Sequence, residues 1–191
     1  MNKKIAKSFH ILSDFDGTLT MPIVRGKKVP SLISILRDNN FLSSGYREEA
    51  HALYKKYHNY ENKKMPLAKK KKLMLKWWSE HFKLLMRYGL SKKILIKIAN
   101  HPSIRLRMGV KNFFLLLKKF KIPIIILSSS GIGEVISIFL KKKKLLSKNV
   151  HVITNTFIWD KNGKAIGIRL PIIHAANKDE ANLRNLSICK M

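Results

Sequence analysis

The chain has 191 residues, of which 46% are hydrophobic, enough to bury one good core with a smaller subdomain. Its 39 Lys and Arg against 11 Asp and Glu give a formal net charge of +28, which attracts polyanions non-specifically, although the lysines are spread through every segment. The single cysteine excludes an internal disulfide, and the apolar runs are too short for a membrane helix. We therefore expect a cytoplasmic protein without the usual form of signal peptide.

The first predicted element is a short buried strand over 11–13 that breaks into a tight loop, Asp-Phe-Asp-Gly-Thr. Alternate residues of an extended segment point the same way, so Asp14 and Asp16 converge just past the strand end, where open α/β sheets hold ligands. Beside a hard cation such as Mg²⁺, one carboxylate can act as nucleophile and the other can carry a proton. An Asp-rich turn that caps a helix is the competing interpretation.

Residues 21–40 have the composition of a linker that leaves the core domain. Apolar residues at helical spacing then predict helices over 46–60 and 67–88, and a third helix with Ser91 as its N-cap. None of these segments alternates like a strand, so 40–100 is predicted to be a helical block inserted into an α/β core. Such a block can close over the carboxylates and exclude water.

The core is predicted to resume with an amphipathic helix over 109–120. The strand over 122–127 is β-branched and apolar without alternation, as expected for a strand covered on both faces. The remaining predicted elements are a helix through 135–140, a strand over 150–154, a hairpin that pairs 156–159 with 165–168, and a last helix that begins near 177–179.

A Ser/Gly loop at 128–133 follows the strand over 122–127. A strand, such a loop and a helix together offer hydroxyls and backbone N–H groups to a phosphate, although a Ser/Gly turn taken alone is mostly just a turn. A single lysine such as Lys178, near the start of the last predicted helix, is ordinarily a surface residue.

The string D-F-D-G-T-L-T at 14–20 resembles the first motif of the haloacid-dehalogenase-like (HAD) phosphatases. Further segments resemble, in the same order, the cytosolic 5'-nucleotidase type III or pyrimidine 5'-nucleotidase family: G-K-K-V-P (26–30), W-W (77–78), G-V-K-N-F-F (109–114), I-P-I-I-I-L-S-S-S-G-I-G-E-V (122–135) and H-A-A-N-K-D-E-A-N-L-R (174–184). The similarity covers nearly the whole chain. It implies a Rossmann-like core with a parallel sheet, formed by 1–39 and 101–191, and an inserted helical cap at 40–100.

The resemblance implies an Mg²⁺-dependent hydrolase of nucleoside 5'-monophosphates, chiefly pyrimidine ones such as CMP and UMP. We expect a monomer. Asp14 would be phosphorylated, and Asp16 would protonate the leaving 5'-oxygen and then activate water. The Asp14 carboxylate and the Asp16 backbone carbonyl would hold the metal. Ser129 and Lys178 would hold the phosphate, with Ser130 lining the site.

The resemblance also implies two substrate contacts in the cap. Glu61 stands where the family has a carboxylate and would contact the nucleoside. His81 falls where the family has a small hydroxyl residue that touches substrate, and a histidine on this apolar stripe is also compatible with a packed core residue. Gly17 departs from the larger residue that is more frequent in the family.

The chain ends 13 residues after Lys178, whereas the family continues through another strand whose acidic motif completes the magnesium shell. We therefore expect an unpaired hydrophobic sheet edge and weak or absent activity. The alternative is a truncated, catalytically impaired relative, which either binds nucleic acid or other polyanions non-specifically through its positive charge or is a non-functional remnant. The base preference stays open.

Overall fold

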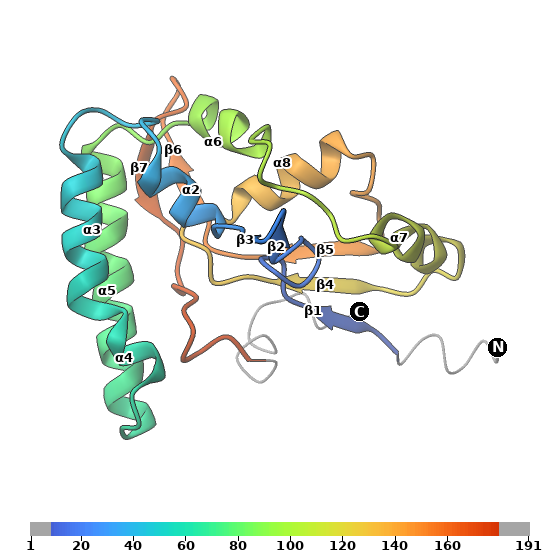
Figure 1. Ribbon diagram of the computed structural model, residues 1–191, viewed down its shortest axis with the longest axis horizontal. Helices are drawn as coiled ribbons and strands as arrows, with labels where there is room; N and C mark the ends of the chain where they lie inside the picture. Colours follow the sequence, from blue (N-terminus) through green and yellow to red (C-terminus); the bar gives the residue numbers. More distant parts are fainter. Residues whose placement is uncertain (1–8, 180–191) are drawn as a thin grey trace.

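The computed structural model describes residues 9–179, in which helices lie on one side of a small central sheet and beyond both of its ends (Figure 1). The sheet has three parallel strands in the order β1-β4-β5, namely β1 (Ile11–Ser13), β4 (Ile124–Leu127) and β5 (Val150–Ile153). Neighbouring parallel strands need long crossover connections. Helices form part of the connection from β1 to β4 and of the connection from β4 to β5. The predicted α/β class and parallel sheet are confirmed.

The burial of the strands follows their order in the sheet. β4 is central and buried along its whole length, as its apolar sequence predicts. The prediction that 11–13 is buried is wrong, because Leu12 is 43% exposed. Among residues 9–179, β1 pairs with β4 alone and lies at the edge of the sheet.

The segment 21–40 is ordered structure, so its prediction as a linker is wrong. β2 (Ile23–Val24) and β3 (Lys27–Lys28) form an antiparallel hairpin, and α2 (Leu32–Asp38) follows. Ser31 caps α2, since its hydroxyl accepts a hydrogen bond from the Ser34 backbone N–H. Leu32, Ile35 and Leu36 of α2 are buried, which shows that their spacing is that of a core-facing helix.

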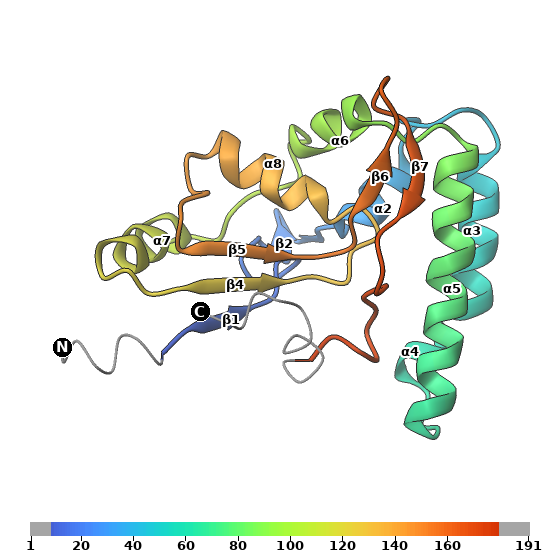
Figure 2. The same cartoon turned by 180° about the vertical axis from the view of Figure 1, so that it is seen from behind.

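The predicted helices between residues 46 and 99 are confirmed, with altered ends. They are α3 (Tyr46–Tyr57), α4 (Asn59–Asn62), α5 (Leu67–Arg87) and α6 (Lys92–Ala99). α3 and α5 stand side by side, facing the carboxyl ends of the parallel strands (Figures 1 and 2). Ser91 occupies the N-cap position of α6, but its side chain makes no capping hydrogen bond.

The second half of the chain follows its predicted order. α7 (Val110–Lys119) precedes β4, and α8 (Glu134–Lys142) precedes β5 and packs against α6. The predicted hairpin is formed by β6 (Phe157–Trp159) and β7 (Ala165–Ile168), and β7 contacts α5. The predicted last helix falls outside residues 9–179, apart from its first residues.

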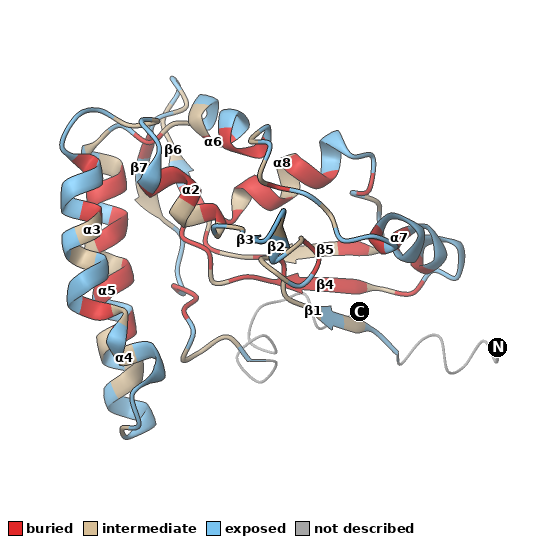
Figure 3. Cartoon of the chain, in the orientation of Figure 1, coloured by how far each residue is buried: buried red, intermediate tan, exposed pale blue. Residues whose placement is uncertain are grey.

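One hydrophobic cluster joins the helices to the sheet (Figure 3). It includes Leu36 of α2, Ala50 of α3, Phe82 of α5 and Ile136 of α8, together with Ile126 of β4. The division into a core and a cap therefore does not coincide with a gap in the packing, and it stays a prediction.

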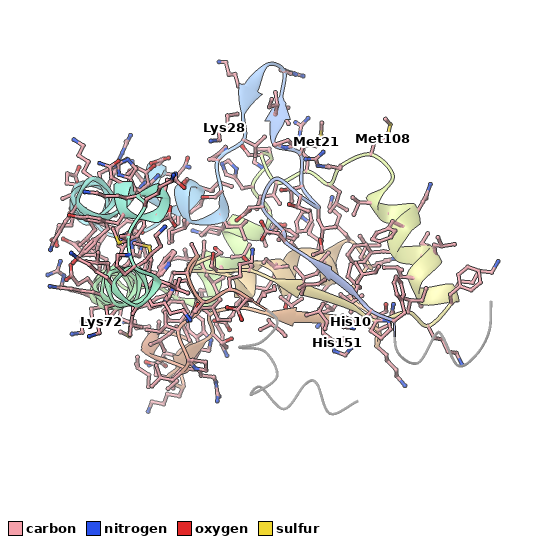
Figure 4. All side chains as sticks on the ribbon, turned by 90° about the horizontal axis from the view of Figure 1, so that it is seen from below. His10, Met21, Lys28, Lys72, Met108 and His151 are labelled. Carbon is pink, nitrogen blue, oxygen red and sulfur yellow. The ribbon has the colours of Figure 1, made fainter. Side chains whose placement is uncertain are left out.

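Charged side chains cover much of the outer surface. Lys72 lies on α5 and Lys28 on the β2–β3 hairpin, and both are exposed (Figure 4). Across residues 9–179, no helix combines the length and the hydropathy needed to cross a bilayer.

Candidate active site

The aspartate loop begins where β1 ends. Phe15 is fully buried and packs edge-on against the ring of Phe139. Gly17 has a φ of +73°, which glycine adopts readily, and its N–H donates to Thr20 Oγ1 over 2.9 Å. The loop is thereby tightly turned, with Asp14 and Asp16 on either side of the Phe15 anchor.

Lys178 reaches the aspartate loop from the opposite end of the chain. Its Nζ donates to Asp14 Oδ1 over 2.6 Å, in an ion pair that joins positions 164 residues apart. Asn177 stabilises the turn before the lysine, accepting from the His174 N–H at 2.7 Å and donating to the Ile172 carbonyl at 2.8 Å. The local turn therefore positions Lys178 toward the carboxylate.

Asn155 joins the Ser/Gly loop at 128–133, called the serine loop below, to the segment that carries Lys178. It is 1% exposed, and its Nδ2 donates to the carbonyl oxygens of Ser130 (3.2 Å) and Ile173 (2.8 Å). Its Oδ1 accepts from the Ile173 N–H at 2.8 Å. Sequence analysis missed this residue, although its place just after β5 puts it, like Asp14, at the carboxyl ends of the parallel strands.

The serine loop is packed so closely that two of its positions accommodate only glycine. A Cβ on Gly133 would lie 1.5 Å from Thr154 Oγ1, and a Cβ on Gly131 would lie 2.4 Å from the Trp78 ring. The second approach also brings α5 directly against the loop. The Ser/Gly composition is thus explained by packing on two sides, and not only by turn formation.

All seven predicted site residues line one cavity of about 600 Å³, which is within the usual size range of small-molecule sites. They are Asp14, Asp16, Glu61, His81, Ser129, Ser130 and Lys178. Besides the aspartate loop, four separate stretches of the chain supply these seven residues: α4, α5, the serine loop and the turn at 174–178.

The two carboxylates of the aspartate loop lie in different environments. Burial raises the pKa of Asp16 to about 6, and the negative charge of Asp14 adds to this increase. A hydrogen bond from the Leu32 N–H to Asp16 Oδ2, at 3.4 Å, and the charge of Lys178 both oppose the increase. Near neutral pH, Asp16 therefore takes up a proton more readily than an ordinary aspartate, as a proton-carrying group requires.

Glu61 and His81 line the part of the cavity that the helices form. Although Glu61 is classed as exposed over the whole residue, burial of its carboxyl group raises its pKa. Lys70 Nζ donates to the Glu61 backbone carbonyl over 2.8 Å and so anchors α4 to α5. His81 is 4% exposed and lies 3.2 Å from the Tyr46 hydroxyl, measured to Nε2, so it is both packed in the core and part of the cavity wall.

Comparison with protein-family models matches residues 17–191 to the family described as Pyrimidine 5'-nucleotidase (UMPH-1). The chain belongs to the pyrimidine 5'-nucleotidase family. Asp14 and Asp16 lie just before the matched range, so the match itself does not include them. The predicted family resemblance is confirmed.

Several relatives of this pyrimidine 5'-nucleotidase family chain are curated 5'-nucleotidases. It is 30% identical over 176 residues to the human 7-methylguanosine phosphate-specific 5'-nucleotidase. This alignment covers 92% of this chain and 58% of the human protein. It is 31% identical over 179 residues to the enzyme of the same name from Drosophila melanogaster, covering 93% and 56%. The chain thus spans less than two thirds of these relatives.

Solved structures agree with the family assignment. Cytosolic 5'-nucleotidase IIIB bound to cytidine superposes with a TM-score of 0.71 at 27% identity, over 90% of this chain and 60% of that one. A HAD family hydrolase from Salmonella enterica serovar Typhi has a TM-score of 0.58 at 17% identity, over 95% and 52%. The second match supports the HAD-like fold alone.

Sequence analysis of this pyrimidine 5'-nucleotidase family chain missed part of the cavity wall. Arg37 and Tyr54 line the cavity, as do Trp77 and Trp78 of α5. Arg37 lay in the segment predicted to be a linker, so it gave no functional signal. The tryptophan pair supported the family resemblance, but no role in the site was assigned to it.

The burial of His81 leads to a testable pH dependence of stability. Burial, aided by the charge of Arg37, lowers its pKa to about 4. The unfolded chain, with an ordinary histidine pKa near 6.5, therefore binds the extra proton first as the pH falls. The contribution of the neutral imidazole to the free energy of unfolding is therefore full above about pH 6.5 and declines toward pH 4. At pH 4.5 it is lower by about 2 to 3 kcal/mol.

Urea unfolding of the parent chain and of His81→Gln at pH 7 and pH 4.5 checks this expectation. Glutamine keeps a hydrogen-bond acceptor for Tyr46 but does not titrate. We expect the parent to lose more stability than the variant between the two pH values. An equal loss would contradict a buried neutral His81.

Proposed function

We propose that this chain is a 5'-nucleotidase that acts through an aspartyl-phosphate intermediate. The observation that carries the proposal is the convergence of Asp14, Asp16 and Lys178 beside the serine loop in one cavity. Membership of the pyrimidine 5'-nucleotidase family supports the same reaction class. The predicted division into a core and a closing cap belongs to this proposal.

The proposed reaction has two steps. Asp14 attacks the phosphorus atom while Asp16 donates its proton to the leaving 5'-oxygen, which releases the nucleoside. The carboxylate of Asp16 then takes a proton from water as that water attacks the phosphorylated Asp14, which releases phosphate and restores both side chains. Lys178 offsets the charge of Asp14 and of the phosphate, and Ser129 and Ser130 face the phosphate oxygens.

The donors around Asp14 suit a hard divalent cation such as Mg²⁺. Its carboxylate and the backbone carbonyl of Asp16 are oxygen ligands of the kind that this ion prefers. Within residues 9–179, no group of three or more His, Cys, Asp or Glu is arranged to hold a metal. Water would therefore fill the coordination positions that Asp14 and Asp16 leave open. When bound, Mg²⁺ supplies charge neutralisation at the phosphate.

The proposed substrates are nucleoside 5'-monophosphates, with CMP and UMP first, handled in the cytoplasm by a monomer. Glu61 and His81 would contact the nucleoside from the helical side of the cavity. A relative is named for 7-methylguanosine phosphate, and a structural neighbour is described as bound to cytidine. We therefore include 7-methylguanosine monophosphate among the substrates to be tested.

Removal of magnesium tests the proposed function. We expect phosphate release from CMP and UMP to fall by about 100-fold or more with a chelator, and to recover when Mg²⁺ is added back, because charge neutralisation by the metal contributes several kcal/mol. A colorimetric phosphate assay of the full chain measures both states. Release that is indifferent to the chelator would contradict the proposal.

The alternative is a catalytically impaired polyanion-binding protein, which the net charge of +28 favours. It predicts no phosphate release with either metal state, together with RNA binding that weakens steeply as salt increases. The two functions are therefore separated by one assay of turnover and one salt titration.

A further inference from the structure

Arg37 is a buried charged residue that the proposed reaction does not use. It lies near the end of α2, is 9% exposed, and lines the cavity. Its guanidinium carbon lies 4.4 Å from the centre of the Tyr54 ring, which belongs to α3. Arg37 is thereby held where α2 meets the helices that form one wall of the cavity.

The guanidinium of Arg37 has more hydrogen-bond donors than the surrounding side chains use. Nε donates to Asp38 Oδ1 over 3.3 Å, and Nη2 donates to Ser34 Oγ over 3.2 Å. A guanidinium has five N–H groups, and no acceptor in residues 9–179 is assigned to the other three. These three N–H groups can therefore donate to water or to an acceptor of a molecule bound in the cavity that Arg37 lines.

Helix α2 sets the separation between Arg37 and the reacting groups. Its first residue, Leu32, donates its N–H to Asp16 Oδ2. Arg37 follows five residues later, about 7 to 8 Å along the axis at the usual helical rise. A nucleoside 5'-monophosphate has its ribose between phosphate and base, so a phosphate at Asp14 leaves its base on the scale of this separation.

The charge of the cavity favours a neutral acceptor over a second anion. Its acidic side chains outnumber its basic ones: Asp14, Asp16, Asp38 and Glu61 against Lys28, Arg37 and Lys178. Asp16 carries a proton at the start of the proposed reaction, so the formal charges of the cavity are then balanced. A second anionic group would gain little, because the Arg37 charge is already partnered by Asp38. A carbonyl oxygen satisfies the free donors without adding charge.

We propose that Arg37 recognises the base of the substrate by donating to the keto oxygen that uracil carries where cytosine carries an amino group. The inference rests on the proposed nucleotidase function and adds a base preference to it. A guanidinium has donors but no acceptor, so it pairs with the keto oxygen and leaves the amino group unpaired. The parent chain is therefore expected to prefer UMP to CMP.

The test compares the two nucleotides on the full chain carrying Arg37→Met. We expect kcat/KM for UMP to fall about 10- to 100-fold and that for CMP to change less than about threefold, since a hydrogen bond to a charged group is lost for UMP alone. Calorimetric binding of UMP and CMP to the Asp14→Asn chain, with and without Arg37→Met, measures the same ratio without turnover. Equal losses for both nucleotides would mean that Arg37 only supports Tyr54, and would overturn the proposal.

Lys28→Met is the matched control, because Lys28 is a second cation on the cavity wall but lies on the exposed β3. We expect Lys28→Met to weaken the binding of UMP and the binding of CMP equally. Thermal unfolding of Arg37→Met shows whether the fold is retained. A parent chain that binds neither nucleotide removes the nucleotidase proposal as well, whereas a parent that binds both, with a ratio unchanged in Arg37→Met, removes only the role of Arg37.

Discussion

Asp14→Asn is expected to lower phosphate release from CMP by about four orders of magnitude or more, the scale seen when an enzyme loses its nucleophile. The amide is a much weaker nucleophile than the carboxylate, and Lys178 loses its charged partner. Phosphate release at saturating Mg²⁺ measures the loss. Release that continues at the parental rate would exclude Asp14 as the nucleophile and, with it, the aspartyl-phosphate.

Asp16→Asn separates the proton-transfer role from the nucleophilic one. A proton donor matters most when the leaving group is a poor one, such as the 5'-oxygen of a nucleoside, and little when it is p-nitrophenolate. We expect the rate of the first step to fall by a factor of about 10² to 10⁴ with CMP and by much less with p-nitrophenyl phosphate. Asp14→Asn serves as the comparison, since it is expected to abolish both reactions.

Gly133→Ala is expected to be among the most destabilising single substitutions in this chain. The added Cβ would lie 1.5 Å from Thr154 Oγ1, 2.5 Å from its Cβ and 2.8 Å from its Cγ2, so the serine loop or the end of β5 has to move. We expect a loss of about 3 kcal/mol or more, as for severe overpacking, together with loss of phosphate release. Urea unfolding and the phosphate assay measure the two effects.

Thr154→Gly provides the control for this clash. All three atoms nearest the added Cβ belong to the Thr154 side chain, so the double variant removes the obstruction. We expect Gly133→Ala to cost much less in the Thr154→Gly background than in the parent, giving a coupling energy of about 1 to 3 kcal/mol. Additive losses would show that the close approach is not what requires glycine at this position.

Local sequence signals were sufficient for the elements that carry the site. The apolar run of β4 and the Asp and Ser/Gly loops each depend on residues adjacent in sequence. The structure places both loops at one cavity, and β4 leads directly into the Ser/Gly loop. The linker prediction for 21–40 failed because the apolar residues of α2 occupy barely two helical turns, too short for a clear period. Burial of β1 was mispredicted because apolar composition does not reveal a strand's position within its sheet.

Long-range partners were the part of the site that residue patterns could not supply. Lys178 was selected among 39 basic residues only through the family resemblance, and its bond to Asp14 spans 164 positions. Arg37 and Asn155 gave no comparable signal, because their importance comes from Tyr54 and from the serine loop, neither of which adjoins them in sequence.

The hydrophobic cluster shared by α2, α3, α5, α8 and β4 has a consequence for how the molecule comes apart. A helical block with a separate core would melt on its own, as a first and distinct transition. Here the same buried side chains support the helices and the sheet, so denaturation is expected to take both together in one cooperative step. Large displacements of α5 would expose Phe82 and its buried neighbours to water, at a high cost in free energy. We therefore expect a nucleotide to enter through small movements of the residues at the mouth of the cavity.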